Sequence, residues 1–452
     1  MVDGINFKQL LAQFDTNKDG KINKQEAEKI GFLPFKVEED LTEEVFNMKI
    51  KGLSIEQSEK EPATLKQSVK NTLPPCCTFP YEVPIKKVSS LEEIPVGTHG
   101  GIRDAMFTDI SGLNLTQEQL LDLCIDDTTV LSDEQKAMLK EPFENMKNPG
   151  LGIRDLHEQG ITGKGVKIAI VDQSLSPHNE YSDRIVFYEE HGKEEKPDFF
   201  KEGSFHGPSV TSIAVGENVG VAPDADVVYF AATTDNKNYA EAINRVVELN
   251  KKLPDNEKIP VISISWGFNP NGDDYNLIQE AVQNAKENGV YIVYSGSDIL
   301  GANRNPQADA DNPENYTMGA FLTDRYESRY KDALEKNPDT TPEDIYDGDY
   351  AREYLLVPMD HRTVADLKSE DGYRFDGNDG GMSWAVPWYA GMYALAKQVR
   401  PDITPEEFEK AALDTATECR VKDGVFKGKL AGMLINPKAL IENITSEKQD
   451  SN

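Results

Sequence analysis

Residues 166–171 read Val-Lys-Ile-Ala-Ile-Val and run directly into Asp172-Gln-Ser. A short, nearly continuous apolar run that is rich in β-branched residues is typical of a strand buried on both faces. Asp172 would then lie at the carboxyl end of that strand, which is the edge where sites form in open α/β sheets. This stretch therefore predicts a parallel sheet and, at its edge, a candidate functional carboxylate.

The same pattern continues towards the C-terminus. Apolar runs typical of strands lie at 227–231, 261–265 and 291–294, and helical patterns lie between them at 239–253 and 277–288. Buried strands that alternate with helices predict a parallel sheet covered on both faces, in the α/β class. An apolar helix follows from Ser383 to about Val399. We place this domain at residues 151–443 and a polar tail at 444–452.

The first 150 residues have a different character. We divide them into a small helical module at 1–34 and a linker and helical region at 35–150. The second part contains two capping-box patterns, Thr116-x-x-Gln and Ser132-x-x-Gln, which predict two helix starts. The sequence leaves open whether this region is a prosegment that is removed or a permanent part of the fold.

Charge and composition argue against several classes of partner. The chain has 48 Lys and Arg against 79 Asp and Glu, a net charge of −31, so nucleic acid and anionic membrane are not expected as main partners. No apolar run is long enough for a membrane span, and the N-terminus lacks the pattern of a signal peptide. We expect a cytoplasmic protein; export without a signal peptide and the oligomeric state stay open.

A calcium-binding pattern lies in the N-terminal module. Residues 15–26 read Asp-Thr-Asn-Lys-Asp-Gly-Lys-Ile-Asn-Lys-Gln-Glu, which fits the EF-hand loop with its glycine at the sharp turn. The sequence therefore predicts a bound Ca²⁺ ion in a structural or regulatory role. The alternative is a solvated turn in which Asp and Asn bond their own backbone. The expected ligands are oxygens of Asp15, Asn17, Asp19, Asn23 and Glu26, and the main-chain carbonyl of Lys21.

Two further patterns supply the other groups that peptide hydrolysis by a serine requires, which are a base and a nucleophile. His206, in Phe-His-Gly-Pro-Ser-Val, stands at the start of a predicted helix. Ser383, in Gly-Met-Ser-Trp-Ala-Val-Pro, opens the apolar helix, where main-chain N–H groups can hold a developing oxyanion. With Asp172 they make a candidate triad. The other histidines lie in polar or turn-like sequence and are expected on the surface: His99, His157, His178, His191 and His361.

The three patterns, in this chain order, resemble the Asp, His and Ser boxes of the subtilisin-like serine proteases, the subtilases of peptidase family S8. The resemblance covers roughly residues 150–443 and implies a three-layer αβα fold with a mostly parallel sheet. It implies that Ser383 attacks the scissile carbonyl of a peptide or protein substrate, that His206 transfers the proton, and that Asp172 orients the imidazole. It also implies that the substrate is laid as an added strand between two segments, Ser265-Trp266-Gly267 and Tyr294-Ser295-Gly296.

One donor that the resemblance implies is missing. The family normally has Gly-Asn after the strand at 291–294, with the asparagine donating to the oxyanion, whereas this chain has Gly296-Ser297. Ser297 and Ser383 are therefore the candidate oxyanion groups, with Asn303 or Asn305 of the following loop as the alternative to Ser297. Besides an active endopeptidase, two other functions stay open: a catalytically weak or inactive relative that binds peptides or regulates a partner, and a calcium sensor whose α/β domain is a scaffold.

Overall fold

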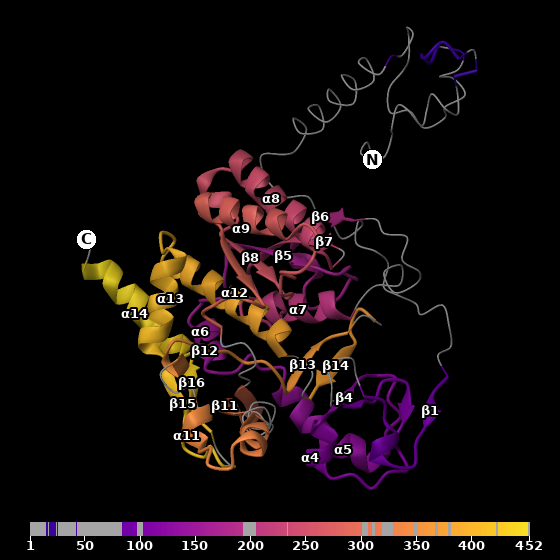
Figure 1. Cartoon of the computed structure of the whole chain (residues 1–452), viewed down its shortest axis with the longest axis vertical. Coiled ribbons are helices and arrows are strands. Elements are labelled where there is room, and N and C mark those ends of the chain that lie inside the picture. The colour runs from indigo at the N-terminus through magenta and orange to yellow at the C-terminus, as the bar shows by residue number, and fades with distance from the viewer. Residues whose placement is uncertain are drawn as a thin grey trace. The chain divides into compact units, whose positions relative to one another are not determined.

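The computed structural model divides the chain into two units, residues 1–64 and 65–452. The second unit contains the α/β domain (Figure 1). None of the helices among the described residues is long and apolar enough to cross a membrane. The described residues are 15–16, 18–23, 25, 42, 84–96, 103–192, 205–232, 234–300, 306–309, 312–318, 329–346, 350–366, 369–377, 381–421 and 424–450.

A five-stranded sheet forms the centre of the α/β domain. Its strand order is β6-β7-β5-β8-β9, and each pair of neighbours is parallel. Because β5 is the middle strand, its last residue, Asp172, lies at the carboxyl edge between the ends of β7 and β8. The strands are β5 (Lys167–Asp172), β6 (Ile185–His191), β7 (Asp226–Ala232), β8 (Val261–Ile264) and β9 (Tyr291–Tyr294).

Alternate residues of β5 face two separate apolar clusters, as the pleat of a strand requires. Ile168 and Ile170 belong to the cluster that contains residues of α7 (His206–Val215) and α12 (Gly381–Val399). Ala169 and Val171 belong to the cluster that contains residues of α8 (Asn236–Lys252) and α9 (Tyr275–Glu287). Figure 1 shows these two helix pairs on opposite sides of the sheet. The predicted α/β domain, with a parallel sheet covered on both faces, is confirmed.

Further elements complete the C-terminal half. The capping box predicted at Thr404 is formed, because its hydroxyl accepts the N–H of Glu407 at 3.2 Å. The last helix continues to Asp450, through most of the segment assigned to a polar tail. Four more helices belong to the described part of this domain: α6 (Ile153–Glu158), α11 (Pro342–Ile345), α13 (Pro405–Thr415) and α14 (Pro437–Asp450). Strands β10 (Pro306–Asp309) and β11 (Asn312–Met318) form a hairpin. A small sheet has the order β12 (Leu355–Leu356), β16 (Leu430–Leu434), β15 (Thr417–Arg420).

In the described residues 84–96 and 103–150, the region before the α/β domain contains short strands, two α-helices and a 3-10 turn at Leu91–Glu93. Both predicted capping boxes are formed: Thr116 accepts the N–H of Gln119, and Ser132 accepts that of Gln135, each at 3.2 Å. These two predictions from sequence are confirmed. The elements are β1 (Lys86–Lys87), β2 (Arg103–Asp104), β3 (Thr108–Asp109), α4 (Gln117–Leu121), β4 (Leu123–Ile125) and α5 (Asp133–Asn145).

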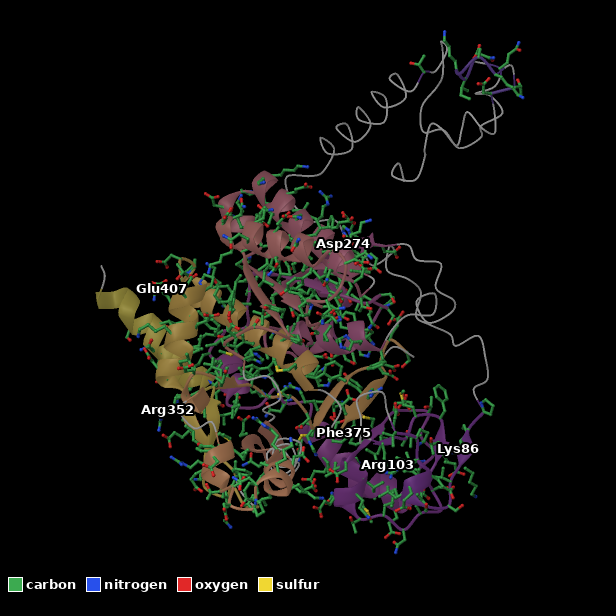
Figure 2. The ribbon with its side chains drawn as sticks, viewed as in Figure 1. Lys86, Arg103, Asp274, Arg352, Phe375 and Glu407 are labelled. Atoms are coloured by element: carbon green, nitrogen blue, oxygen red, sulfur yellow. The ribbon has the colours of Figure 1, made fainter. Side chains whose placement is uncertain are left out.

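Strand β14 (Tyr373–Asp376) connects this N-terminal region to the α/β domain. It forms a hairpin with β13 (Arg362–Ala365) and also pairs with β4, so that the sheet order is β13-β14-β4-β2. Phe375 is fully buried in the core of the N-terminal region, where it stacks on Phe143 with ring centroids 4.7 Å apart (Figure 2). The region therefore shares both a sheet and a core with a hairpin that directly precedes α12.

Candidate active site

Asp172 and His206 make the contact that defines the site. Asp172 ends β5 and is only 1% exposed, and His206 is the first residue of α7. His206 Nδ1 lies 2.7 Å from Asp172 Oδ1, which also accepts the N–H of Gln173 at 2.8 Å. A buried carboxylate in this position orients an imidazole and stabilises its protonated form.

Gly207 explains how α7 approaches β5 so closely. A Cβ at this position would lie 2.6 Å from the main-chain oxygen of Ser174 and 2.7 Å from the Tyr229 hydroxyl. Since real Cβ atoms do not approach other atoms so closely, any side chain here would push the start of α7 away from the end of β5. The glycine is therefore required for the contact between Asp172 and His206.

The pKa of His206 lies above its ordinary value. Burial lowers this pKa, but the charge and the hydrogen bond of Asp172 outweigh burial; Asp376 raises the pKa further and Arg374 lowers it. The side chain keeps 18% exposure, so water can reach it. A histidine that acts as a base must be neutral, so an activity that depends on it should rise with pH through this raised pKa.

Ser383 lies in the first turn of α12, against the end of β8. Its hydroxyl donates to the main-chain oxygen of Ser265 at 3.3 Å, and the Ser265 hydroxyl donates to the Ser383 carbonyl at 2.8 Å. The next residue, Trp384, has its ring centroid 5.4 Å from that of His206. Main-chain N–H groups in the first turn of a helix have no acceptor within the helix and suit a developing anion. The start of α12 thus meets the start of α7 and the end of β8.

The two segments expected to bind a substrate lie next to each other where β8 and β9 end. The Ser295 N–H donates to the Trp266 carbonyl at 3.3 Å. Phe268 and Tyr294 stack with ring centroids 4.4 Å apart. Because the two segments bond each other directly, a peptide strand cannot lie between them, and the expected placement of the substrate between the two segments is wrong. Gly267 is exposed, and a Cβ there would meet nothing within 4 Å. There is therefore open space beside this backbone.

Ser297 lies in the turn after β9, next to the exposed Gly296. Its hydroxyl oxygen accepts the Tyr294 N–H at 2.9 Å, and its own N–H donates to the Tyr294 carbonyl at 2.9 Å. The Ser297 side chain thus closes the turn by accepting a hydrogen bond. Its hydroxyl group can still act as a donor through its hydrogen. The asparagines considered as alternatives, at 303 and 305, lie outside the described residues.

A buried ion pair beside His206 was missed in the sequence. Arg374 and Asp376, both on β14, are 1% and 0% exposed, and the Arg374 Nε bonds Asp376 Oδ1. Asp376 Oδ2 accepts the indole N–H of Trp384 at 3.1 Å. Arg374 and Asp376 lie in a highly charged stretch of sequence, and such a stretch gives no local signal that any of its residues is buried. The tryptophan directly after Ser383 was the sequence signal that could have suggested a buried acceptor nearby.

The expectation that the other histidines lie on the surface is wrong for His178 and His361, which are 1% and 5% exposed. His157 and His191 are half-buried, and His99 lies outside the described residues. His178 Nε2 lies 2.7 Å from the Gly372 carbonyl, and its Nδ1 accepts the Glu180 N–H at 3.1 Å. Both ring nitrogens are therefore satisfied inside the fold, which allows a polar ring to be buried.

The described part of the predicted calcium loop belongs to the first unit. Gly20 has a φ of +80° and donates its N–H to Asp15 Oδ2 at 2.9 Å. Asp19 and Asn23 each accept a main-chain N–H from two residues further on, at 3.0 Å. Among the described residues, the second oxygen of Asp15, Oδ1, is buried and has no hydrogen-bond partner. Two expected ligands lie outside the described residues, Asn17 and Glu26.

Comparison with known proteins identifies several relatives. The "Dibasic-processing endoprotease" of Yarrowia lipolytica (strain CLIB 122 / E 150) is 27% identical over 307 residues, which cover 62% of this chain and 30% of that protein. The "Subtilisin-like protease PopC" of Myxococcus xanthus (strain DK1622) is 26% identical over 298 residues, which cover 59% and 58%. The chain thus spans less than two thirds of either relative. The solved structure of "Prenylagaramide maturation protease PagA" is 19% identical, with a TM-score of 0.42, and the match covers 65% of this chain and 99% of that one.

A family model gives the assignment. The model of the subtilase family, Peptidase S8, matches residues 163–432, which is more than half of the chain. The matched range includes Asp172, His206 and Ser383, and it begins just before β5 and ends within β16. The chain therefore belongs to the subtilase family.

Proposed function

We propose that this subtilase is an active serine endopeptidase with Asp172, His206 and Ser383 as its triad. The observation that carries the proposal is the 2.7 Å contact between His206 and the buried Asp172, at the sheet edge where the helix of Ser383 begins. The raised pKa of His206 supports it, since an imidazole that holds a proton more readily is a stronger base.

The proposed reaction is acyl transfer in two steps. Ser383 Oγ attacks the scissile carbonyl while His206 takes the hydroxyl proton, and His206 then gives this proton to the amine that leaves. Water attacks the resulting acyl-enzyme with His206 again as base, which releases the acid and restores Ser383. Asp172 keeps the imidazole oriented and stabilises its charge in both steps. The peptide would lie along the segments 265–267 and 294–296.

Digestion of a denatured protein tests this proposal. New peptides identified by mass spectrometry should appear with the wild type and be absent with Ser383→Ala. The cleavage sites would also give the residue preference of the enzyme. If no peptides appear with wild-type protein that contains calcium, the chain is not an endopeptidase.

The serine at position 297 favours a second candidate, a catalytically weak or inactive relative that binds peptides or regulates a partner. We expect Ser297→Asn to raise kcat by about 10²- to 10³-fold with little change in KM, because an amide donor would act mainly on the transition state. Steady-state kinetics with one peptide substrate measure this. Ser297→Ala is the matched control, since it removes the hydroxyl without adding an amide and should give no gain. An unchanged kcat in Ser297→Asn would mean that another donor already serves the oxyanion.

We propose separately that the N-terminal loop binds Ca²⁺. The buried, unpartnered Oδ1 of Asp15 and the left-handed Gly20 fit an EF-hand loop, in which carboxylates converge on a hard cation. When bound, the ion would have a structural or regulatory role within the N-terminal module. It would take no part in peptide hydrolysis. The residues that would hold it are Asp15, Asn17, Asp19, Lys21 through its carbonyl, Asn23 and Glu26.

Isothermal calorimetry on the full chain tests this calcium site. We expect binding of one Ca²⁺ ion in the wild type and loss of the binding heat in Glu26→Gln, because position 12 of the loop provides a bidentate carboxylate. Glu28→Gln, just outside the loop, is the matched control and should bind normally. Equal binding heats for Glu26→Gln and the wild type would rule out this loop as the site.

A further inference from the structure

We propose that the buried Arg374–Asp376 pair positions the imidazole of His206 by holding the two aromatic rings that flank it, Phe205 and Trp384. Each member of the pair holds one ring. The inference rests on the proposed function, because it assigns a task to residues around the proposed base. Neither charged residue touches the reacting atoms, so both are positioning residues.

Asp376 holds Trp384. Its Oδ2 accepts the indole N–H at 3.1 Å, and the indole centroid lies 5.4 Å from that of His206, with the planes inclined by 49°. Asp376 is fully buried, so it has no water to turn towards, and its other oxygen is bonded by Arg374. The position of the indole ring is therefore set by its hydrogen bond to Asp376 and by its packing against the His206 ring. Ser383 is the preceding residue on the same helical turn.

Arg374 holds the second ring, that of Phe205. Its guanidinium carbon lies 4.4 Å from the centroid of the Phe205 ring, within the range of a cation–π contact. The Phe205 ring in turn meets the His206 ring edge to face, with centroids 6.2 Å apart. Tilting the imidazole would require one of the two flanking rings to move, and each is held by a buried charge.

Asp172 alone does not determine how the imidazole is placed. A hydrogen bond to one nitrogen fixes that nitrogen but leaves the ring plane able to tilt, and a displacement of about 1 Å at a reacting group can cost about 10²-fold in rate. The flanking rings remove this freedom. A buried ion pair is weak evidence for stability, since apolar residues of similar volume often stabilise a fold as well or better. Its place beside the base is therefore better explained by positioning.

Residues of the N-terminal region contact the strand that carries the Arg374–Asp376 pair. Asp376 pairs in register with the buried Cys124 of β4, and Arg374 Nη1 lies 3.4 Å from Met106 Sδ. Between the two charges, Phe375 is anchored in the core of the N-terminal region. This region thus forms one wall around a pair that acts on His206.

An NMR pH titration of His206 in the full chain tests the coupling without relying on turnover. The resonance is identified by its loss in His206→Gln. The charges nearest to this ring are Asp172 on β5 and Arg374 and Asp376 on β14. Asp376→Asn leaves Arg374 and should lower the pKa of His206, whereas Arg374→Met leaves the carboxylate and should raise it. Loss of packing alone would not produce opposite shifts, so opposite shifts would show that both charges act on His206. An unchanged pKa in both variants would overturn this coupling, and the next variant tests whether the rings are held.

A third variant covers the case in which an unpaired interior charge prevents folding. Trp384→Phe keeps both charges and removes only the indole group that bonds Asp376; we expect kcat to fall about 10²-fold with KM unchanged. Trp388→Phe is the matched control, because Trp388 is a buried tryptophan of the same helix whose N–H bonds the Pro149 carbonyl at 2.9 Å, and its kcat should stay close to the wild type. Equal kcat values in both variants overturn the inference. Opposite pKa shifts in a protein that cleaves no peptide would refute the proposed function and leave the coupling intact.

Discussion

Replacing Ser383 with Ala should lower kcat for a peptide substrate by about 10⁶-fold and leave KM nearly unchanged. The reason is that the variant loses the nucleophile and with it the acyl-enzyme, while the segments that would bind the peptide stay in place. A residual rate of about 10³- to 10⁴-fold over the reaction in water is expected from oxyanion stabilisation and binding. Saturation kinetics with a chromogenic peptide give both constants.

The matched control for this result is Ser446→Ala. Ser446 is an exposed serine of α14 whose hydroxyl bonds the Asn443 carbonyl at 2.8 Å, so its loss should leave both constants unchanged. If Ser383→Ala kept wild-type turnover, another group would have to be the nucleophile, and the proposed triad would be wrong.

Replacing Asp172 with Asn should lower kcat by about 10⁴-fold, because the amide no longer holds the imidazole in the tautomer that can accept the serine proton. The same change should shift the pH profile. Asp172 raises the pKa of His206, so without its charge this pKa falls and the acid limb of kcat/KM moves to lower pH. Initial rates measured across the pH range test both effects in one experiment.

Asp224→Asn is the control for Asp172. Asp224 lies two residues before β7, at the opposite edge of the sheet, where it pairs with Arg184 at 2.9 Å and is 38% exposed. A pair this exposed contributes about 1 kcal/mol or less, so activity and its pH profile should not change. A wild-type rate for Asp172→Asn would show that His206 does not depend on this carboxylate.

Local patterns were enough to predict the sheet and the helices around it. The apolar run ending in Asp172 became β5, and the capping boxes at Thr116, Ser132 and Thr404 all formed. Such features depend on neighbours within a few residues, so the sequence carries them directly. Strand β6 was missed because its second half, Glu-Glu-His, is polar, which an edge strand with one neighbour tolerates.

The support around His206 could not be predicted for a different reason. Strand β14 pairs with β4, which lies roughly 250 residues earlier in the chain, and no local pattern encodes a pairing across that distance. This pairing helps to bury Arg374 and Asp376, and each charge meets the other. The contact between His206 and Asp172 likewise depends on the missing Cβ of Gly207, and the sequence did not reveal that close approach.

The most direct test of the central claim is the intact mass of the chain after exposure to a fluorophosphonate with calcium present, for the wild type and Ser383→Ala. These reagents form a covalent adduct with a serine that an adjacent base activates. We predict a single adduct on the wild type and none on the variant. No adduct on either protein, or the same adduct on both, would contradict the assignment of Ser383 as an activated nucleophile.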